Sequence, residues 1–469
     1  MQQILPAGIP AILLVLIAFM VLFSLFTLLS RKRRIYKVVE IAAVALIAIT
    51  SFSMLLSGYN SNFLYLFQAN AFSELLFGAL SIGIFLILLI SFDSEPQAET
   101  AMFVSFVMLG LFMVAFAYSI IAIIVGLEFV VLSTVFMILS YGKKYLEPAL
   151  KLFVLGAIST AIFVVALALL LPYDSSLSLV GIAAAGAGKF IVGLSLVLFV
   201  AALSIESAAF PFNLWVPDVY DGAPGNVTAL MAGINKKVSF IAILEIFLIV
   251  FASYGIYGNS QLISQAFFLI SILTMFFGNL VALVQKNIKR MFAYSSISQA
   301  GYIFIGISAA THLGIEASIF YIIAHMFMII GAFAIVFWLE TKNIRSIEEY
   351  AGLKDRNAFA AVSLTILMLS MAGIPPLVGF AGKFVLFSSA VYANDIILAL
   401  IGIANSFLSI YYYAKVINQM FQTREVKRIR PGINIIAAVT ICLIFVIAVG
   451  IYPQLLLGWA STAASVLVH

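Results

Sequence analysis

Long runs of apolar residues, separated by short polar segments, recur along the whole chain. Many of these runs exceed about 18 residues, which lets a helix cross the roughly 30 Å apolar core of a bilayer. Continuous apolar runs, rather than alternating ones, select helices over the strands of a closed barrel. The pattern therefore predicts an all-α polytopic membrane protein with about fourteen transmembrane helices. The predicted spans are 8–30, 37–57, 73–92, 100–117, 119–141, 147–172, 188–222, 225–251, 260–284, 290–310, 313–340, 357–390, 393–421 and 434–463.

The polar segments between the predicted spans carry an alternating charge pattern. Most of the 24 lysines and arginines lie in segments that follow odd-numbered spans. The segments 58–72, 173–187 and 252–259, which follow even-numbered spans, contain none. Basic residues are retained on the cytoplasmic side, so we expect both termini on the outer face of a prokaryotic cell membrane. A wrong number of spans would break this alternation, which supports the count of fourteen.

Composition narrows the class of function. The chain is 64% hydrophobic and 9% charged, whereas an average soluble domain is about a quarter charged. The net charge of +5 follows from the topology signal, so no nucleic-acid partner is predicted. Cys442 is the only cysteine, which excludes a four-cysteine iron–sulfur centre. The three histidines are far apart in sequence. We therefore predict no metal site, no cofactor and no redox chemistry in this chain.

Several basic residues lie inside predicted spans. Such a residue costs about 2.5–3.5 kcal/mol at mid-bilayer and is functional by default. Lys236 lies eleven residues into the eighth span, about 16 Å deep at 1.5 Å per residue. Lys237 points about 100° away, so we expect only one of the two to face the interior. Lys383 lies in the twelfth span. Lys151, near a helix end where a long side chain can reach the surface, is a secondary candidate.

Ionisable residues of other types lie at similar positions. Glu128 lies in the fifth span, Glu206 in the seventh and His325 in the eleventh. Each of them alone could be a structural residue paired inside a helix bundle. Together with Lys236 and Lys383 they cost on the order of 10 kcal/mol, which is comparable to the whole stability of an ordinary domain. We therefore predict that these five residues form a pathway for protons.

Two of the predicted helices contain prolines that interrupt them. The seventh span contains Pro211 and Pro217, and the twelfth contains Pro375 and Pro376. Proline frees a backbone carbonyl, which in lipid is tolerated only against protein or a water-filled cavity. Two such breaks, five spans apart, are typical of an inverted-repeat transporter. The predicted organisation is a single transmembrane domain, 1–469, with inverted five-helix repeats over 100–251 (spans four to eight) and 260–421 (spans nine to thirteen).

Several motifs resemble those of a known family. Residues 207–224 read Ser-Ala-Ala-Phe-Pro-Phe-Asn-Leu-Trp-Val-Pro-Asp-Val-Tyr-Asp-Gly-Ala-Pro. This stretch resembles the signature of the antiporter-like subunits of complex I, and its second half is closest to the N-type subunit. The resemblance covers about residues 70 to 420. Other stretches that agree with it are 126–128, 149–157, 289–297, 373–383 and 405–413.

The resemblance implies a proton-translocating membrane-arm subunit of a complex I-like dehydrogenase. Its partners would be the other membrane-arm subunits, the lipid bilayer and protons, and electron transfer to a quinone-type acceptor would take place in other subunits. The family's polar axis falls here on Glu128, Lys236 and Lys383. Glu206 departs from the family, which has a lysine there, so the usual glutamate–lysine pair becomes two carboxylates. His325 lies where relatives hold a histidine.

Two alternatives remain open from the sequence. A subunit of a multi-subunit cation/proton antiporter, or of a membrane-bound hydrogenase, would have the same fold. A non-transporting scaffold subunit would explain Glu206 as the mark of a lost pathway. The sequence also leaves open whether the electron donor is NADH, reduced deazaflavin or ferredoxin, and whether protons or sodium ions move.

Overall fold

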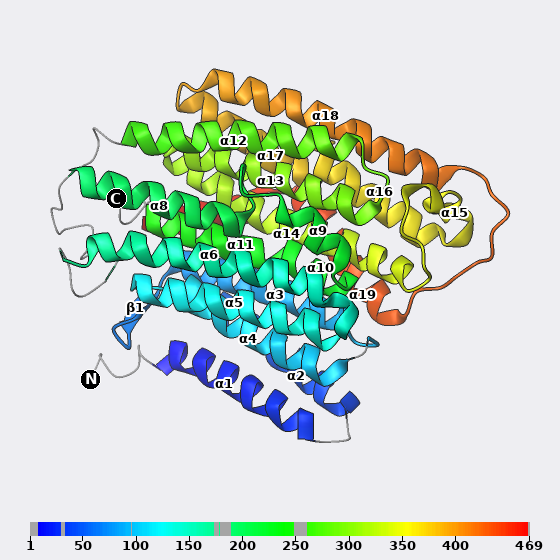
Figure 1. Cartoon of the computed structure of the whole chain (residues 1–469), viewed down its shortest axis with the longest axis horizontal. Helices are drawn as coiled ribbons and strands as arrows, with labels where there is room; N and C mark the ends of the chain where they lie inside the picture. Colours follow the sequence, from blue (N-terminus) through cyan, green and yellow to red (C-terminus); the bar gives the residue numbers. More distant parts are fainter. Residues whose placement is uncertain are drawn as a thin grey trace. The chain divides into compact units, whose positions relative to one another are not determined.

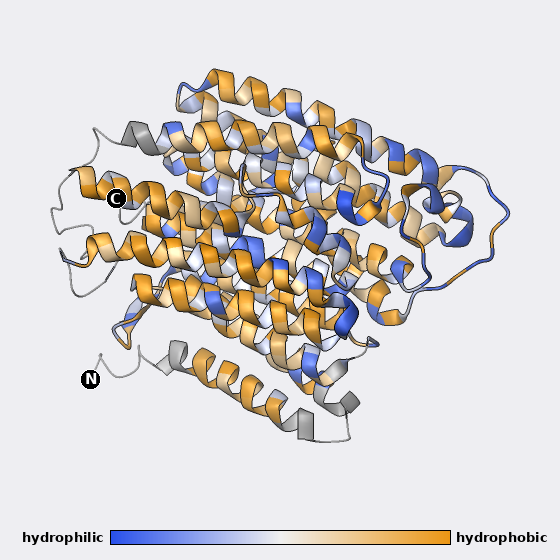
Figure 2. Ribbon diagram, viewed as in Figure 1, coloured by the Kyte–Doolittle hydropathy of each residue, from blue (hydrophilic) through white to orange (hydrophobic). Residues whose placement is uncertain are grey.

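The computed structural model describes residues 8–29, 33–94, 96–172, 178, 189–247 and 260–467. In these residues the chain is helical apart from connections and one small hairpin (Figure 1). Hydrophobic residues run along the helices, and hydrophilic ones gather in several connections (Figure 2). Eleven helices of the described part are long and apolar enough to cross a membrane. The chain is therefore an all-α multi-pass membrane protein, as the hydropathy pattern predicts.

The chain divides into two compact units. The first consists of Met1–Ser207, Ile234–Ile263 and Trp459–His469. Its helices are α1 (Gly8–Leu29), α2 (Arg33–Ser57), α3 (Ala71–Ile90), α4 (Gln97–Ala115), α5 (Ile120–Ser140), the short η1 (Lys143–Tyr145), α6 (Leu146–Leu170), α8 (Lys189–Ser207) and α11 (Lys236–Glu245). The strands β1 (Ser61–Phe63) and β2 (Phe67–Ala69) pair antiparallel between α2 and α3.

Small residues set the spacing of helices in the first unit. A Cβ atom on Gly110 of α4 would lie only 2.5 Å from the carbonyl oxygen of Gly126 on α5. The two helix backbones therefore approach closely at this point, as small residues allow in membrane helices. Gly126 lies two residues before Glu128 on the same helix, so this contact helps to fix the position of the Glu128 carboxylate.

The second unit consists of Ala208–Gly233 and Ser264–Gly458. Its helices are α9 (Trp215–Gly222), α10 (Gly225–Leu230), α12 (Ser260–Leu283), α13 (Ile288–Ala309), α14 (His312–Glu340), η5 (Ile347–Tyr350), α15 (Leu353–Arg356), α16 (Ala358–Ala372), α17 (Val378–Tyr392), α18 (Ile396–Phe421) and α19 (Ile433–Ile451). Helix α14 is buried along its apolar length and packs against α10, α13, α16, α17 and α19. The π-helical turn Met231–Asn235 continues α10 into α11, and α20 (Gln454–Leu467) is the last helix described.

Each of the fourteen predicted spans contains at least one helix. The eleven apolar helices correspond to eleven of these spans. The other three are the first span, whose apolar part is Ile12–Leu25, the more polar α13, and the twelfth span, which is split into two shorter helices. The last span is also split, between α19 and α20 at Pro453, which was not predicted. The placement of both termini concerns residues 1–7 and 468–469, which lie outside the described residues.

The two predicted helix breaks take a defined form. Helix α8 ends at Ser207 and α9 begins at Trp215, with Pro211 between them. Helix α16 ends at Ala372 and α17 begins at Val378, with Pro375 and Pro376 between them. Pro217 was predicted to help break the seventh helix, but it lies in the first turn of α9. Proline is tolerated in a first turn because that N–H has no helical partner. The inverted relation of the two repeats stays a prediction.

Candidate functional site

Lys383 of α17 lies at the break between α16 and α17, and its side chain is only 2% exposed. Its Nζ donates hydrogen bonds to the carbonyl oxygen of Ala372 at 3.3 Å and to Ser406 Oγ at 3.0 Å. Ser406 Oγ donates in turn to the same carbonyl at 2.9 Å. Gly373 has φ of +90° and leaves room for the lysine stem, since a Cβ there would lie 3.1 Å from Lys383 Cδ. The backbone opened at the break thus solvates the ammonium.

An aromatic ring completes the surroundings of this lysine. The Lys383 Nζ lies 4.3 Å from the ring centroid of Tyr302 on α13. A cation over an aromatic face gains about 0.5–2 kcal/mol, and the gain is larger where water is excluded. A carbonyl, a hydroxyl and an aromatic face therefore surround the ammonium, and none of these groups carries a full charge.

A chain of polar side chains joins the same break to His325. Gln299 of α13 donates from Nε2 to the carbonyl oxygen of Met371 at 3.1 Å, one residue before Ala372. The Tyr321 hydroxyl donates to Gln299 Oε1 at 2.5 Å. The Tyr321 ring stacks on the imidazole of His325, with centroids 6.4 Å apart. The structure therefore connects His325 to the helix break beside Lys383 through Gln299 and Tyr321, two neutral side chains that were not predicted.

Two further predicted residues, Glu128 and Glu206, come together in the first unit. Thr160 Oγ1 on α6 donates a hydrogen bond to Glu128 Oε1. The neighbouring Ser159 donates from Oγ to the carbonyl oxygen of Ala202 on α8 at 2.9 Å, one turn before Glu206. The Glu206 carboxyl lies close enough to Glu128 for their charges to interact. Both glutamates are half-buried. Consecutive hydroxyl residues of α6 thus connect the Glu128 carboxyl on α5 to the turn of α8 that precedes Glu206.

Lys236 and Lys237 follow the π-helical turn Met231–Asn235 at the start of α11. Asn235 Nδ2 donates to Thr134 Oγ1 on α5 at 2.7 Å, which ties this turn to a neighbouring helix. The two lysines are 2% and 1% exposed. The expectation that only one would face the interior is therefore wrong. Helix α11 packs against α4, α5 and α8 and every one of its residues is buried, so it has no outward face.

Lys151 differs from the other lysines of the predicted pathway. Its Nζ forms an ion pair with Glu147 Oε1 at 2.8 Å, one turn earlier on α6. The two side chains are 39% and 77% exposed. An exposed pair spaced four residues apart on a helix contributes only about 0.3–0.5 kcal/mol. The structure therefore gives Lys151 surface contacts rather than a place among the buried charges.

Sequence reasoning missed several buried acids. Glu40, Glu74 and Glu245 are at most 3% exposed, and each has carboxyl oxygens without a hydrogen-bond partner among the described residues. All three lie within predicted spans, Glu40 and Glu74 near predicted helix ends. An acidic residue inside a predicted span is therefore the sequence signal that identifies them. An isolated buried carboxylate is costly, so each is a further candidate for holding a proton.

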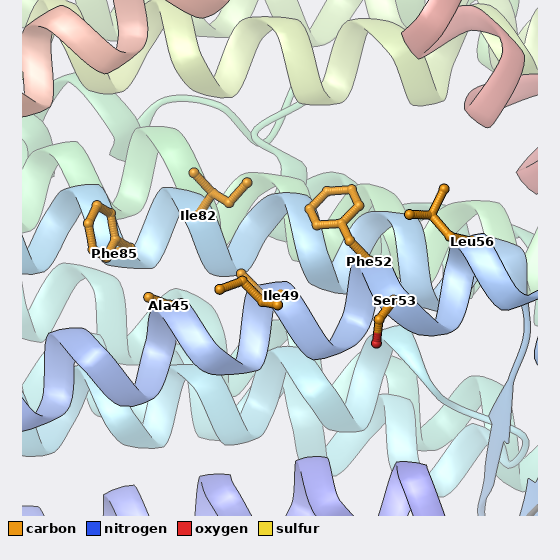
Figure 3. Close-up of a pocket in the computed structure, with 8 residues that line it drawn as sticks. Ala45, Ile49, Phe52, Ser53, Leu56, Ile82 and Phe85 are labelled. Atoms are coloured by element: carbon orange, nitrogen blue, oxygen red, sulfur yellow. The ribbon is translucent and has the colours of Figure 1, made fainter.

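The described residues include no group of three or more histidine, cysteine or acidic side chains placed to hold a metal ion. A groove between α2 and α3, with a volume of about 490 Å³, is apolar (Figure 3). Its lining includes a single hydroxyl, Ser53, which already donates to the Thr50 carbonyl at 2.7 Å. This groove therefore offers no ligand to an ion, and the ionisable residues lie elsewhere.

A multi-pass helical bundle with buried lysines and glutamates beside broken helices is the architecture of an ion-translocating membrane protein. The family model described as NADH:quinone oxidoreductase/Mrp antiporter, TM matches residues 117–409. The chain therefore belongs to this family, which confirms the resemblance found in its motifs.

Two curated relatives extend beyond that match. NADH-quinone oxidoreductase subunit N of Desulforamulus reducens is 38% identical over 378 residues, which cover 78% of each chain. F(420)H(2) dehydrogenase subunit N of Methanosarcina mazei is 35% identical over 395 residues, covering 80% of this chain and 79% of the relative.

Solved structures agree with the fold. A chain of respiratory complex I from Thermus thermophilus with bound aureothin is 27% identical, with a TM-score of 0.82, and the match covers 95% of this chain and 99% of that one. A chain of the Mrp complex from Dietzia sp. has a TM-score of 0.87 at 20% identity, covering 99% of this chain and 96% of that one. The second likeness concerns the fold alone.

Proposed function

We propose that the chain is a proton-translocating membrane-arm subunit of a complex I-like dehydrogenase, in which other subunits transfer electrons to a quinone-type acceptor. The proposal rests mainly on Lys236 and Lys383, which are both 2% exposed inside helices of a membrane protein. One of the curated relatives described above is named as a subunit of an NADH-quinone oxidoreductase, and the other as a subunit of an F(420)H(2) dehydrogenase. The likeness to the Mrp complex concerns the fold alone, so the dehydrogenase is favoured over a separate antiporter.

In this proposal protons move between four groups in the chain. Glu128 and Glu206 form the coupling element and share a proton, because two adjacent carboxylates cannot both ionise cheaply. Lys236 is the central relay, and Lys383 is the exit-side site. A proton leaves when an ammonium N–H bond breaks and its proton passes to a water or hydroxyl oxygen, and the lysine becomes neutral. The carbonyl of Ala372 and the hydroxyl of Ser406 hold the Lys383 ammonium in place until then.

The electrostatic magnitudes are adequate for coupling. Two unit charges about 8 Å apart interact by roughly 2 kcal/mol at an effective dielectric constant near 20. Moving one charge against 100 mV costs about 2.3 kcal/mol. The two energies are similar in size, so a change of charge at that distance would supply most of the energy needed to expel a proton from the next site. Redox chemistry in other subunits would start this sequence, and the bilayer would maintain the gradient that it creates.

The proposal includes a location and an orientation. The chain lies in the cell membrane of a prokaryote with both termini on the outer side, since its basic residues gather in alternate connections. Reporter tags at each terminus, probed in intact cells with a membrane-impermeant reagent, would test the orientation. Labelling from outside is expected for both, and protection of either one would contradict it.

The decisive experiment replaces Lys236 by methionine in the assembled complex, reconstituted in vesicles. Electron transfer is followed with the complex's own donor, NADH or reduced deazaflavin, and proton uptake with a pH-sensitive dye. We expect proton transport by this chain to be lost while the complex remains assembled. Lys151→Met is the matched control, because it removes an exposed lysine that pairs with Glu147. Unchanged transport in Lys236→Met would leave only the scaffold alternative.

A further inference from the structure

A group of charged residues in the second unit lies outside the proton pathway described above. It joins the start of α13 and the end of α14 to the corner between α9 and α10, residues 222–225. Arg290 Nη1 lies 2.9 Å from Asp218 Oδ1 on α9. Asn287, which caps α13, donates from Nδ2 to Asp221 Oδ1 at 2.8 Å. The two motifs 217–224 and 289–297, far apart in sequence, are therefore in direct contact.

Lys289 is the most buried member of this group, with a side chain only 2% exposed. Its Nζ donates to the carbonyl oxygen of Ala223 at 2.6 Å, inside the corner. It also pairs with Glu340 Oε1 at 3.2 Å, and Arg345 approaches the same oxygen at 3.3 Å. Glu340 also lies against Gly225, two residues after Ala223, because a Cβ on Gly225 would come within 2.6 Å of Glu340 Oε2. The ion pair thus fixes the backbone on both sides of Pro224.

The corner leads directly to the central relay. Helix α10 begins at Gly225 and continues through the π-helical turn into α11, whose first residue is Lys236. The segment has no break between the corner and this lysine. The corner and Lys236 therefore belong to one continuous helical segment of the chain. Proton transfer depends steeply on distance, because a donor and an acceptor must come within about 3.2 Å or share one water.

We propose that Lys289 and Glu340 are positioning residues for proton translocation. Their ion pair holds the α9–α10 corner, and through it the position of the helix that carries Lys236, while neither residue carries a transported proton. This inference rests on the proposed function of Lys236. Removing one partner of a buried pair leaves an uncompensated charge, which is strongly destabilising locally. The corner is therefore expected to loosen when either partner loses its charge.

The test compares Lys289→Met, Glu340→Gln and Lys289→Arg in the assembled, reconstituted complex. For the first two variants we expect at least about a threefold fall in protons moved per electron, since about 1 Å of misplacement can cost up to about 100-fold. Hydrogen exchange should accelerate in 218–232 and stay unchanged in α12. Lys289→Arg should keep most of the ratio, because arginine still pairs with Glu340 but does not release its proton. Lys286→Met, at an exposed lysine three residues earlier, is the matched control.

Three outcomes would overturn the inference. An unchanged proton-to-electron ratio in both Lys289→Met and Glu340→Gln would show that the pair is not needed. A loss of pumping in Lys289→Arg as deep as in Lys289→Met would make Lys289 a proton carrier instead. Faster exchange throughout the chain would indicate general destabilisation. If Lys289→Met does not assemble, Glu340→Gln and Lys289→Arg decide by the same criteria. Failure of the proposed function itself is recognised separately, by full pumping in Lys236→Met.

Discussion

The ends of two half-helices, α8 and α16, offer a direct comparison. The C-terminal end of a helix carries a partial negative charge, which favours cations. At the end of α16 the Ala372 carbonyl accepts a hydrogen bond from the Lys383 ammonium. In the last turn of α8 the ionisable residue is Glu206, a carboxyl with a second carboxyl, Glu128, nearby. The end of α16 therefore stabilises the charge of Lys383. The end of α8 instead disfavours an ionised Glu206 and favours a proton shared between the two carboxyls.

This difference suggests a division of labour between the two breaks. The α16 end stabilises the Lys383 ammonium through the Ala372 carbonyl. Release of the lysine's proton must overcome this attraction, which suits the last site before exit. The α8 end makes charge expensive, so a proton placed there responds strongly to any new charge nearby. A lysine at position 206, as in the family pattern, would make the two ends alike. The predictions below test the comparison from the largest expected effect to the smallest.

The largest effect is expected for Lys383→Met, which removes the matched cation from the α16 end. Proton transport should fall to the residual level of Lys236→Met, while electron transfer and assembly persist. The double variant should be no lower than either single variant, because residues that act as one unit are not additive. Lys415→Met, at an exposed lysine of α18, is the control. A double variant clearly below both single ones would place the two lysines on separate pathways.

A smaller effect is expected from changes at the mismatched end. Glu206→Gln keeps the shape of the side chain but cannot carry a proton, so transport should fall by about 100-fold, the low end of what proton-transfer groups contribute. Glu206→Lys should keep at least about half of the transport, since lysine suits a helix C-terminus and can pair with Glu128. Proton uptake in vesicles measures both variants. Full activity in Glu206→Gln would rule out a shared proton at this pair.

A weaker effect is expected from the ring beside Lys383. Tyr302→Leu removes the aromatic face 4.3 Å from Nζ, a contribution of about 0.5–2 kcal/mol, so transport should fall by about twofold to thirtyfold. Tyr302→Phe keeps the face and should behave like the unchanged protein. Tyr411→Leu, at a tyrosine that is 66% exposed, serves as the control. Equal losses in the Phe and Leu variants would assign the effect to the hydroxyl rather than to the ring.

The sequence predicts the framework of this site for clear physical reasons. A charge inside an apolar run and a proline inside a predicted helix are each costly in lipid, so Lys383 and Pro375 are conspicuous without a structure. The carbonyl of Ala372, which accepts the hydrogen bond from the Lys383 ammonium, is harder to predict from the sequence. It depends on the exact residue at which α16 ends, which is Ala372, just before Gly373 takes a left-handed backbone conformation.

Neutral polar partners were not predictable from the same pattern. Gln299 follows several serines in the more polar α13, and Tyr321 lies in the apolar α14, so the spacing of polar residues distinguishes neither of them. Their role depends on the packing of α13 against α14 and on the free carbonyl of Met371. Lys237 was judged by its angle on an isolated helix, whereas its burial depends on how many neighbours surround α11. Tertiary packing therefore decides these features, and local sequence does not.

The smallest effect is expected at Glu349. This carboxylate lies at the N-terminal end of a helix, whereas Glu206 lies at a C-terminal end. It lies in the first turn of η5, in the connection after α14, where it accepts hydrogen bonds from the backbone N–H groups of Arg345 and Ser346. These bonds hold the pKa of Glu349 below its usual value. The stabilisation is therefore present above the ordinary glutamate pKa and is lost as the pH falls through the lowered one.

Glu349→Gln should remove this pH dependence at a cost of about 0.5–1 kcal/mol in local stability, the usual contribution of a helix cap. Hydrogen exchange of the Arg345 and Ser346 amides, compared with the variant at matched pH, measures the effect. Protection in the unchanged protein should exceed that in the variant at neutral pH, and the two should converge in acid. Proton transport should stay unchanged. Glu348→Gln, at an exposed neighbour, is the control. If the two proteins show equal protection at all pH values, a carboxylate near a helix N-terminus gains little stability in this protein. The unfavourable position of a charge at Glu206 would then be due to Glu128 alone, and not to the end of α8.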